Sequence, residues 1–142
     1  MHYQINEGSF KVPDGMQDNS INMLLADQSG LGFNVVVTRS RLESGETFEQ
    51  LVDRQLQMLG QQFSKTEISD RRGQKDPSSG ELRAVEYAVQ FKQDGAMVYQ
   101  RQIGYLLGDT GKVVVMTAAA QAPLSDTQLA QWRAIHSSFK PH

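Results

Sequence analysis

The clearest hydrophobic pattern in the chain is an alternation of apolar and other residues over positions 82–92. Its apolar positions are Val85, Tyr87, Val89 and Phe91, and polar residues occupy most of the positions between them. A period of two places successive side chains on opposite faces, so the run predicts a β-strand with one face toward a core. Asp94-Gly95 follows, and this dipeptide favours a tight hairpin turn. Residues 82–92 and 96–107 are therefore predicted to pair antiparallel.

The second of these strands, Ala96 to Leu107 (AMVYQRQIGYLL), has an unusual outer face. Its odd positions form a predicted core face broken only by Arg101: Met97, Tyr99, Ile103, Tyr105 and Leu107. Its even positions are Val98, Gln100, Gln102, Gly104 and Leu106. A strand face turned to water usually alternates with charged side chains. This one carries amides and aliphatics instead, so we expect another surface to cover it.

Five further segments are predicted as strands: 9–13, 21–25, 33–39, 66–71 and 113–120. Pro13-Asp14-Gly15 ends the first, because proline presets φ and glycine supplies a positive φ. A turn over Asp27-Gln28-Ser29-Gly30 is expected to join the second and third as a hairpin. A tight turn over Gly108 to Gly111 brings 113–120 back beside 96–107. With 82–92, these strands form an antiparallel meander.

Two helices are predicted, over Glu46–Phe63 and Leu124–Phe139. Each begins with a capping box, Thr47 with Gln50 and Ser125 with Gln128. At about 100° per residue, one broad arc of the first helix collects its apolar residues: Phe48, Leu51, Val52, Leu56, Met58, Leu59 and Phe63. The predicted inward side of the second holds Leu129, Trp132, Ile135 or His136, and Phe139. Strand runs with separate helices indicate an α+β fold, an antiparallel sheet packed by two main helices, in a single domain over residues 1–142.

Charge and composition exclude several classes of protein. Sixteen acidic and fourteen basic residues give a net charge of -2, which offers no basic footprint for nucleic acid. The chain has no cysteine, so disulfides and thiolate metal sites are excluded. The N-terminal residues do not resemble a signal peptide, and no apolar run reaches about 18 residues. A cytoplasmic protein that does not insert into the membrane is expected.

The sequence contains no recognisable catalytic or metal-binding arrangement. Its histidines, His2, His136 and His142, lack a second ligand-type residue at helical spacing. There is no nucleophile elbow, phosphate-binding loop or dinucleotide fingerprint. Arg71, Arg72 and Lys75 are interpreted as a solvated loop. We expect no enzyme activity, no cofactor and no metal.

Two groups of amides remain unexplained by a simple core. Gln55 lies near the middle of the apolar arc of the first helix, where an amide needs hydrogen-bond partners or an interface. It could bond a nearby loop, and Gln100 and Gln102 could face solvent. Alternatively, all three line a groove for an apolar helix. There, buried apolar area would supply attraction and the amides would bond exposed backbone groups.

Three segments resemble the Eag chaperones of type VI secretion systems. They are FKVPDGMQDNSINM (Phe10 to Met23), RQL (Arg54 to Leu56) and RQ (Arg101, Gln102), and the P-D-x-x-x-D-x-S-I-N run is the most specific part. The resemblance implies a DcrB-like α+β sandwich, related to the photosystem subunit PsbP, and a homodimer without enzyme activity. It implies a chaperone that holds the N-terminal transmembrane helices of an effector in the cytoplasm. Such effectors carry a PAAR domain, often with an Rhs cage, and are loaded on the VgrG spike.

The resemblance also assigns effector-helix-binding residues, which are Ile21, Met23, Gln55, Leu59, Phe63, Val98 and Gln102. Strand and helix periodicity independently place members of this set on common faces. Leu59 is bulkier than the small residue of some relatives, so groove depth is expected to differ. The DcrB branch is a lipoprotein, and because this chain lacks the lipidation cysteine and signal, membrane anchoring is not expected. A generic adaptor of the same fold, binding a folded partner, is the alternative.

Overall fold

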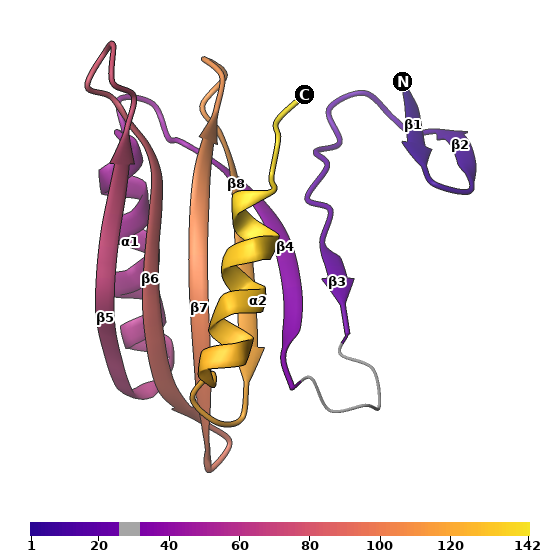
Figure 1. Ribbon diagram of the computed structural model, residues 1–142. Helices are drawn as coiled ribbons and strands as arrows, with labels where there is room; N and C mark the ends of the chain where they lie inside the picture. The colour runs from indigo at the N-terminus through magenta and orange to yellow at the C-terminus, as the bar shows by residue number, and fades with distance from the viewer. Residues whose placement is uncertain (26–31) are drawn as a thin grey trace.

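The computed structural model describes residues 1–25 and 32–142. In these ranges the chain forms a two-stranded hairpin, a six-stranded antiparallel sheet and two helices (Figure 1). The hairpin consists of β1 (His2–Ile5) and β2 (Gly8–Lys11). The sheet strands are β3 (Asn22–Leu24), β4 (Asn34–Arg41), β5 (Ser64–Lys75), β6 (Leu82–Gln93), β7 (Ala96–Leu107) and β8 (Lys112–Ala120). The helices are α1 (Phe48–Gln62) and α2 (Asp126–Ser137). The predicted α+β class is confirmed.

The sheet order is β3-β4-β8-β7-β6-β5, which places β7 between its two meander neighbours. Tyr87 of β6 pairs with Gln102 of β7, which pairs with Thr117 of β8. Directly paired residues point to the same face of a sheet, so this register fixes two distinct faces. The helices lie on opposite faces, α1 behind β5 and β6 and α2 in front of β7 and β8 in Figure 1. The protein is thus a helix–sheet–helix sandwich.

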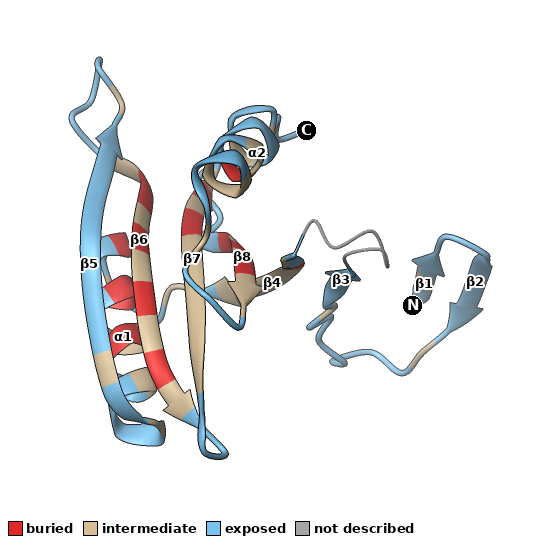
Figure 2. Cartoon of the chain, turned by 60° about the horizontal axis from the view of Figure 1, so that its bottom comes forward, coloured by how far each residue is buried: buried red, intermediate tan, exposed pale blue. Residues whose placement is uncertain are grey.

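Each helix makes its own core against the sheet. The α1 core contains the buried residues Phe48, Leu51, Val52, Leu56, Val85, Tyr87, Val89, Phe91, Leu106 and Val113. The α2 core contains Ile103, Met116, Ala118 and Trp132. Buried positions alternate along β6 and β8, as Figure 2 shows for β6. The alternation in each strand therefore arises because every second residue is buried against one of the two helices.

Both predicted capping boxes are present. Thr47 Oγ1 accepts from Gln50 N at 3.2 Å, and Gln50 Oε1 accepts from Thr47 N at 2.9 Å. Ser125 and Gln128 make the same pair of bonds at α2. These reciprocal bonds satisfy donors that a helix start leaves without partners.

Several predicted boundaries were wrong. The first strand, predicted over residues 9–13, is β2 over Gly8–Lys11, and its partner β1 was missed. The strand predicted over 66–71 extends over the whole of β5, with register shifts and positive φ at Lys65 (53°) and Asp70 (54°). The second helix ends at Ser137 rather than Phe139. The predicted turn over residues 27–30 lies outside the described residues, although β3 and β4 do pair antiparallel.

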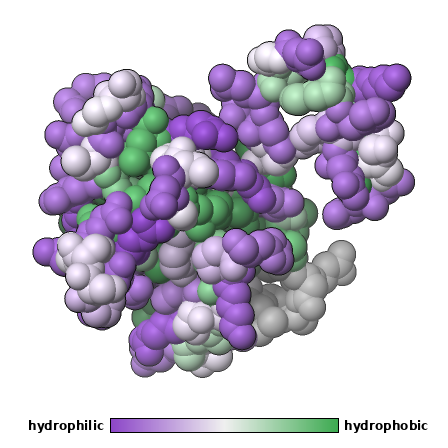
Figure 3. All heavy atoms as spheres, turned by 90° about the horizontal axis from the view of Figure 1, so that it is seen from above, coloured by the Kyte–Doolittle hydropathy of each residue, from purple (hydrophilic) through white to green (hydrophobic). Residues whose placement is uncertain are grey.

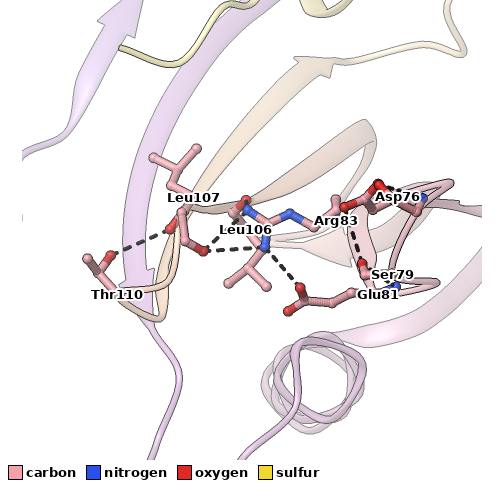
Figure 4. Close-up of polar contacts among 9 residues, drawn as sticks. Asp76, Ser79, Glu81, Arg83, Leu106, Leu107 and Thr110 are labelled. Atoms are coloured by element: carbon pink, nitrogen blue, oxygen red, sulfur yellow. Dashed lines mark hydrogen bonds and ion pairs between the residues drawn. The ribbon is translucent and has the colours of Figure 1, made fainter.

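One arginine ties the start of β6 to the end of β7 (Figure 4). Arg83 Nη2 donates to the Leu106 carbonyl at 2.8 Å, and Nη1 donates to the Gly108 carbonyl at 3.3 Å. Nη1 also lies 3.4 Å from Glu81 Oε2. These bonds satisfy carbonyls at the point where β7 ends, and so they hold the β7–β8 turn against the sheet.

The β1–β2 hairpin stands apart from the six-stranded sheet in all three whole-molecule views (Figures 1–3). Tyr3 and Phe10 face each other with ring centroids 5.5 Å apart, and the Tyr3 hydroxyl bonds Ser20 Oγ at 2.8 Å. Ile5 and Phe10 are 43% and 49% exposed. The hairpin is therefore held mainly by its own cross-strand contacts.

Candidate functional site

Helix α1 covers only part of its face of the sheet. Leu51 and Met58 are seven positions apart, about two turns, so they lie on nearly the same side of the helix. Leu51 is fully buried, whereas Met58 is 57% exposed. Met58 therefore lies at the border of the covered area, although Leu59 and Phe63 after it still pack against the α1 core. Met58 belongs to the apolar arc seen in the sequence, but its side chain does not join the core.

The uncovered part of this face, hereafter the open face, crosses four strands. By register it carries Val98, Gln100 and Gln102 of β7, Thr117 and Ala119 of β8, Val36 and Thr38 of β4, and Met23 of β3. All are half-buried except Met23, which is 61% exposed. The open face thus combines apolar side chains with uncharged polar ones, and none of these residues is charged.

The amides on β7 form a hydrogen-bonded chain that begins in the α1 core. The Tyr87 hydroxyl donates to Gln102 Oε1 at 2.6 Å, and Gln102 Nε2 donates to Gln100 Oε1 at 2.7 Å. Tyr87 is 6% exposed, and burial raises its pKa to about 12. Its hydroxyl therefore stays protonated at neutral pH and can donate. The two amides are bonded to each other rather than only to water.

Gln55 connects α1 to the far side of its face. Its Nε2 donates to Ser40 Oγ of β4 at 3.2 Å. The partner is thus a strand residue and not the loop that the simpler interpretation expected. The amide on the apolar arc is explained by this bond, which joins α1 to β4.

The other predicted binding residues lie at the borders of the same face. Leu59, Phe63 and Val98 pack against the α1 core, and Phe63 stacks on Phe91 with centroids 4.5 Å apart. At the opposite border, Ile21 just before β3 and Met23 within it are 64% and 61% exposed. The structure thus distributes the predicted set around the open face. Their part in binding stays a prediction.

Two of the predicted core assignments on β7 need correction. The odd positions were expected to face the core, and the even positions were expected to be covered by another surface. Ile103 is buried in the α2 core, but on the even face Leu106 is buried in the α1 core and Val98 packs against it. Because helices lie on both faces, β7 has apolar residues on both sides.

The arginines of the segments that resemble the Eag chaperones, Arg54 and Arg101, form ion pairs within the protein. Arg54 Nε lies 2.9 Å from Glu46 Oε2, and its Nη2 donates to Glu46 Oε1 at 3.0 Å. The hydrogen bonds from Arg54 lower the pKa of Glu46, and the pair holds the segment before α1 against the helix. Arg101 lies on the α2 face, with Nη1 3.6 Å from Asp70 Oδ2. Neither arginine belongs to the open face.

The described residues lack two further features. In these ranges, no group of three or more histidine, aspartate or glutamate side chains is placed to hold a metal ion. Neither described helix combines the length and apolar character needed to cross a membrane.

Comparison with known proteins supports the fold. The family model for DcrB matches residues 7–138, nearly the whole chain. The chain belongs to the DcrB family. A crystal structure of a Pseudomonas aeruginosa protein of unknown function, described as a candidate regulator, superposes on this DcrB-family chain with a TM-score of 0.74 and 22% identity. The match covers 100% of this chain and 96% of the other. No curated protein matched the sequence.

Sequence reasoning missed the roles of several residues on and around the open face in this DcrB-family protein. Met58 is one, and its helical spacing from Leu51 gave no hint that its side chain would be exposed. Tyr87 is another, and here a signal existed. A two-residue turn at Asp94-Gly95 fixes the register in which Tyr87 lies opposite Gln102. The β4 and β8 members of the face required the strand order, which the chain does not state.

Proposed function

We propose that this DcrB-family protein is a chaperone for apolar helices, which binds and shields the N-terminal transmembrane region of a type VI secretion effector in the cytoplasm. The main observation in support of this proposal is the open face, where exposed apolar side chains lie around a small cluster of amides. The resemblance to the Eag chaperones supplies the client class, a PAAR or Rhs effector to be loaded on the VgrG spike. It also supplies the expectation that the protein works as a homodimer without cofactor or catalysis.

The apolar borders supply the attraction in this proposal. Ile21, Met23 and Met58 are each more than half exposed. Burying apolar surface gains roughly 25 cal/mol per Å², so covering these side chains with a helix is favourable. Met23 and Met58 add adaptability, because an unbranched thioether side chain can fit client surfaces of different shape.

The amides supply the polar part. Gln102 and Gln100 lie on β7, on the side of the open face opposite Met23 of β3. A helix taken from a membrane has few polar side chains, and small residues on it leave backbone carbonyls accessible. Amides on β7 can bond such groups, whereas charged side chains would lose hydration against an apolar client.

The proposal is tested by co-purification with the effector N-terminus. Gln102→Ala and Ile21→Asp are expected to keep the fold and lose the client. Ile135→Asp is a matched control, because Ile135 is an exposed isoleucine on α2, on the opposite face. If both open-face variants retain wild-type amounts of client, the binding face is assigned wrongly.

A second arm separates a chaperone from a generic adaptor. Deleting the transmembrane segments of the client removes what a chaperone recognises and leaves the folded domains in place. A chaperone then loses the client and an adaptor keeps it. Retention of the truncated client would overturn the proposed function.

A further inference from the structure

The six-stranded sheet has an unpaired stretch of edge beside β3. Strand β3 pairs only with Val35, Val36 and Val37 of β4. Residues 38–41 of β4 pair with β8 on one edge and, within the described residues, with no strand on the other. Their pairing with β8 is regular, whereas the opposite sheet edge, β5, has register shifts against β6. A regular edge presents backbone N–H and C=O groups that another strand can bond.

A cavity of about 600 Å³ lies against this edge. Arg39, Ser40 and Arg41 of β4 line it, together with Lys112 of β8 and residues 16–19, which precede β3. Successive strand residues point to opposite faces, so three consecutive lining residues place the cavity beside the edge of β4 rather than over one face. Its volume is in the range of pockets that hold a small organic ligand, so a ligand larger than a simple ion fits.

The lining of this cavity is cationic, although the net charge of the protein is -2. Arg39, Arg41 and Lys112 contribute three positive charges, and Asp18 contributes one negative charge. Within the described residues, none of the three cations forms an ion pair with an acidic side chain. Arg39 Nη1 instead donates to the Ser20 carbonyl at 3.2 Å. Arg41 and Lys112 are directly paired across β4 and β8, where like charges repel. The cavity therefore favours an anionic ligand.

The spacing of the arginines matches that of an extended chain. Arg39 and Arg41 lie two positions apart on one strand, which is about 6.6 Å, and they point to the same face. In another strand, every second side chain has the same spacing and also shares a face. A strand with alternating acidic residues, added beside residues 38–41, would place successive carboxylates opposite the two arginines. Charged side chains discourage an edge from pairing with ordinary strands, so the same arginines make the edge selective for an acidic one.

We propose that the cavity beside β4 binds an extended segment of a partner protein in which every second residue is acidic, by strand addition to residues 38–41. The acidic side chains bond Arg39, Arg41 and Lys112, and the backbone of the segment continues the sheet. The side chains of Arg39 and Arg41 point away from the open face, which contains Val36 and Thr38 of the same strand. The inference goes beyond the proposed function, and either proposal can fail without the other.

The test uses three fluorescein-labelled peptides of about eight residues, a usual strand length. The first alternates glutamate and threonine. The second has glutamine in place of glutamate, and the third has proline in place of threonine, which removes backbone donors needed for strand pairing. Fluorescence anisotropy is expected to show that the wild-type protein binds the first peptide at least about fivefold more tightly than the other two. This binding should weaken as the NaCl concentration rises from about 50 mM to about 500 mM, because salt screens exposed charges.

Four variants locate the binding site. Arg41→Glu is expected to weaken binding of the acidic peptide at least about fivefold. Arg72→Glu is the matched control, because it changes the net charge equally on β5, at the opposite edge of the sheet. Gln102→Ala alters the open face and should keep peptide binding. Lys112→Gln should weaken binding without lowering the melting temperature, because it removes the repulsion with Arg41. Circular dichroism melting verifies that each variant is folded.

Each contrary outcome overturns a defined part of the inference. If the acidic peptide binds no better than the glutamine peptide, or if Arg41→Glu keeps full binding, the cavity does not bind acidic segments. Equal weakening by Arg72→Glu would show a general effect of net charge instead of a site. If the proline peptide binds as tightly as the first, strand addition is wrong. Loss of the peptide in Gln102→Ala would place it on the open face.

Discussion

Gln55 on α1 and Ser40 on β4 are joined by a hydrogen bond of 3.2 Å between Nε2 and Oγ. Strand β8 lies between β4 and β7 in the sheet, so this bond reaches across the face that α1 covers. It marks where the covered part of the face meets the open part. The same amide was the anomaly that pattern analysis could not place.

A double-mutant cycle tests this bond. Ser40→Ala and Gln55→Leu each remove one partner, and the coupling between them is expected at about 0.5–1.5 kcal/mol, typical of a hydrogen bond in a protein. Urea unfolding of the wild type, both single variants and the double variant gives the value. Additive effects would show that the bond contributes nothing in solution.

Truncation to alanine is expected to lower the unfolding free energy strongly at Leu51 and hardly at Met58. Leu51→Ala removes a fully buried side chain and should cost about 2–5 kcal/mol of unfolding free energy. Met58→Ala should change it by no more than about 0.5 kcal/mol, because the side chain is already 57% exposed. Chemical denaturation measures both. A large loss of unfolding free energy in Met58→Ala would contradict the exposed position of this side chain.

Gly104 tests the packing between α1 and the sheet. A Cβ at this position would lie 3.6 Å from Phe48 Cζ, an ordinary contact. Gly104→Ala is therefore expected to be neutral or to stabilise by about 0.4–1 kcal/mol, since alanine restricts the unfolded chain. Gly104→Val should cost about 1–3 kcal/mol by overpacking. Thermal melting compares the two, and equal melting temperatures would contradict the contact.

His136 gives the stability a pH dependence. Burial lowers its pKa below 6.5, with Arg101 and Arg133 acting in the same direction and Glu86 opposing them. The unfolded chain then binds the proton more readily, so stability is present above pH 6.5 and is lost as pH falls through the folded-state pKa. Unfolding free energies measured between pH 7.5 and about 5 should show this slope. His136→Gln should flatten it, and an unchanged slope would assign the effect elsewhere.

Removal of residues 1–12 should leave the six-stranded sheet folded. The β1–β2 hairpin stands apart from the sheet, and an isolated hairpin contributes little stability in water. The truncated protein is expected to melt cooperatively within a few degrees of the full chain. A broad transition or a much lower melting temperature would show that the hairpin stabilises the six-stranded sheet, which would contradict its separate position.

The sequence was informative where a local rule determined the outcome. Capping chemistry placed the starts of both helices, and the alternation over residues 82–92 identified β6. Both depend on neighbours in the chain. The long extension of β5 was missed because its exposed polar residues follow no hydrophobic period, and pairing with β6 forms the strand instead.

The candidate site was less predictable, because it depends on where α1 stops covering the sheet. Met58 and Leu51 are equivalent in a helical projection, and only the strand order separates their surroundings. The link from Tyr87 to Gln102 could have been read from the hairpin register. The bond from Gln55 to Ser40 could not, since it joins elements that pack together only in three dimensions.

The position of β7 has a consequence for how the molecule fluctuates. It is paired on both edges and packed on both faces, so its amide protons should exchange with solvent among the slowest. Strand β3 is short, paired on one edge and exposed, and its protons should exchange among the fastest. The open face therefore has a rigid side at β7 and a more mobile side at β3. Movement of β3 can change the width of the open face to fit helices of different diameter while the rest of the sheet stays folded.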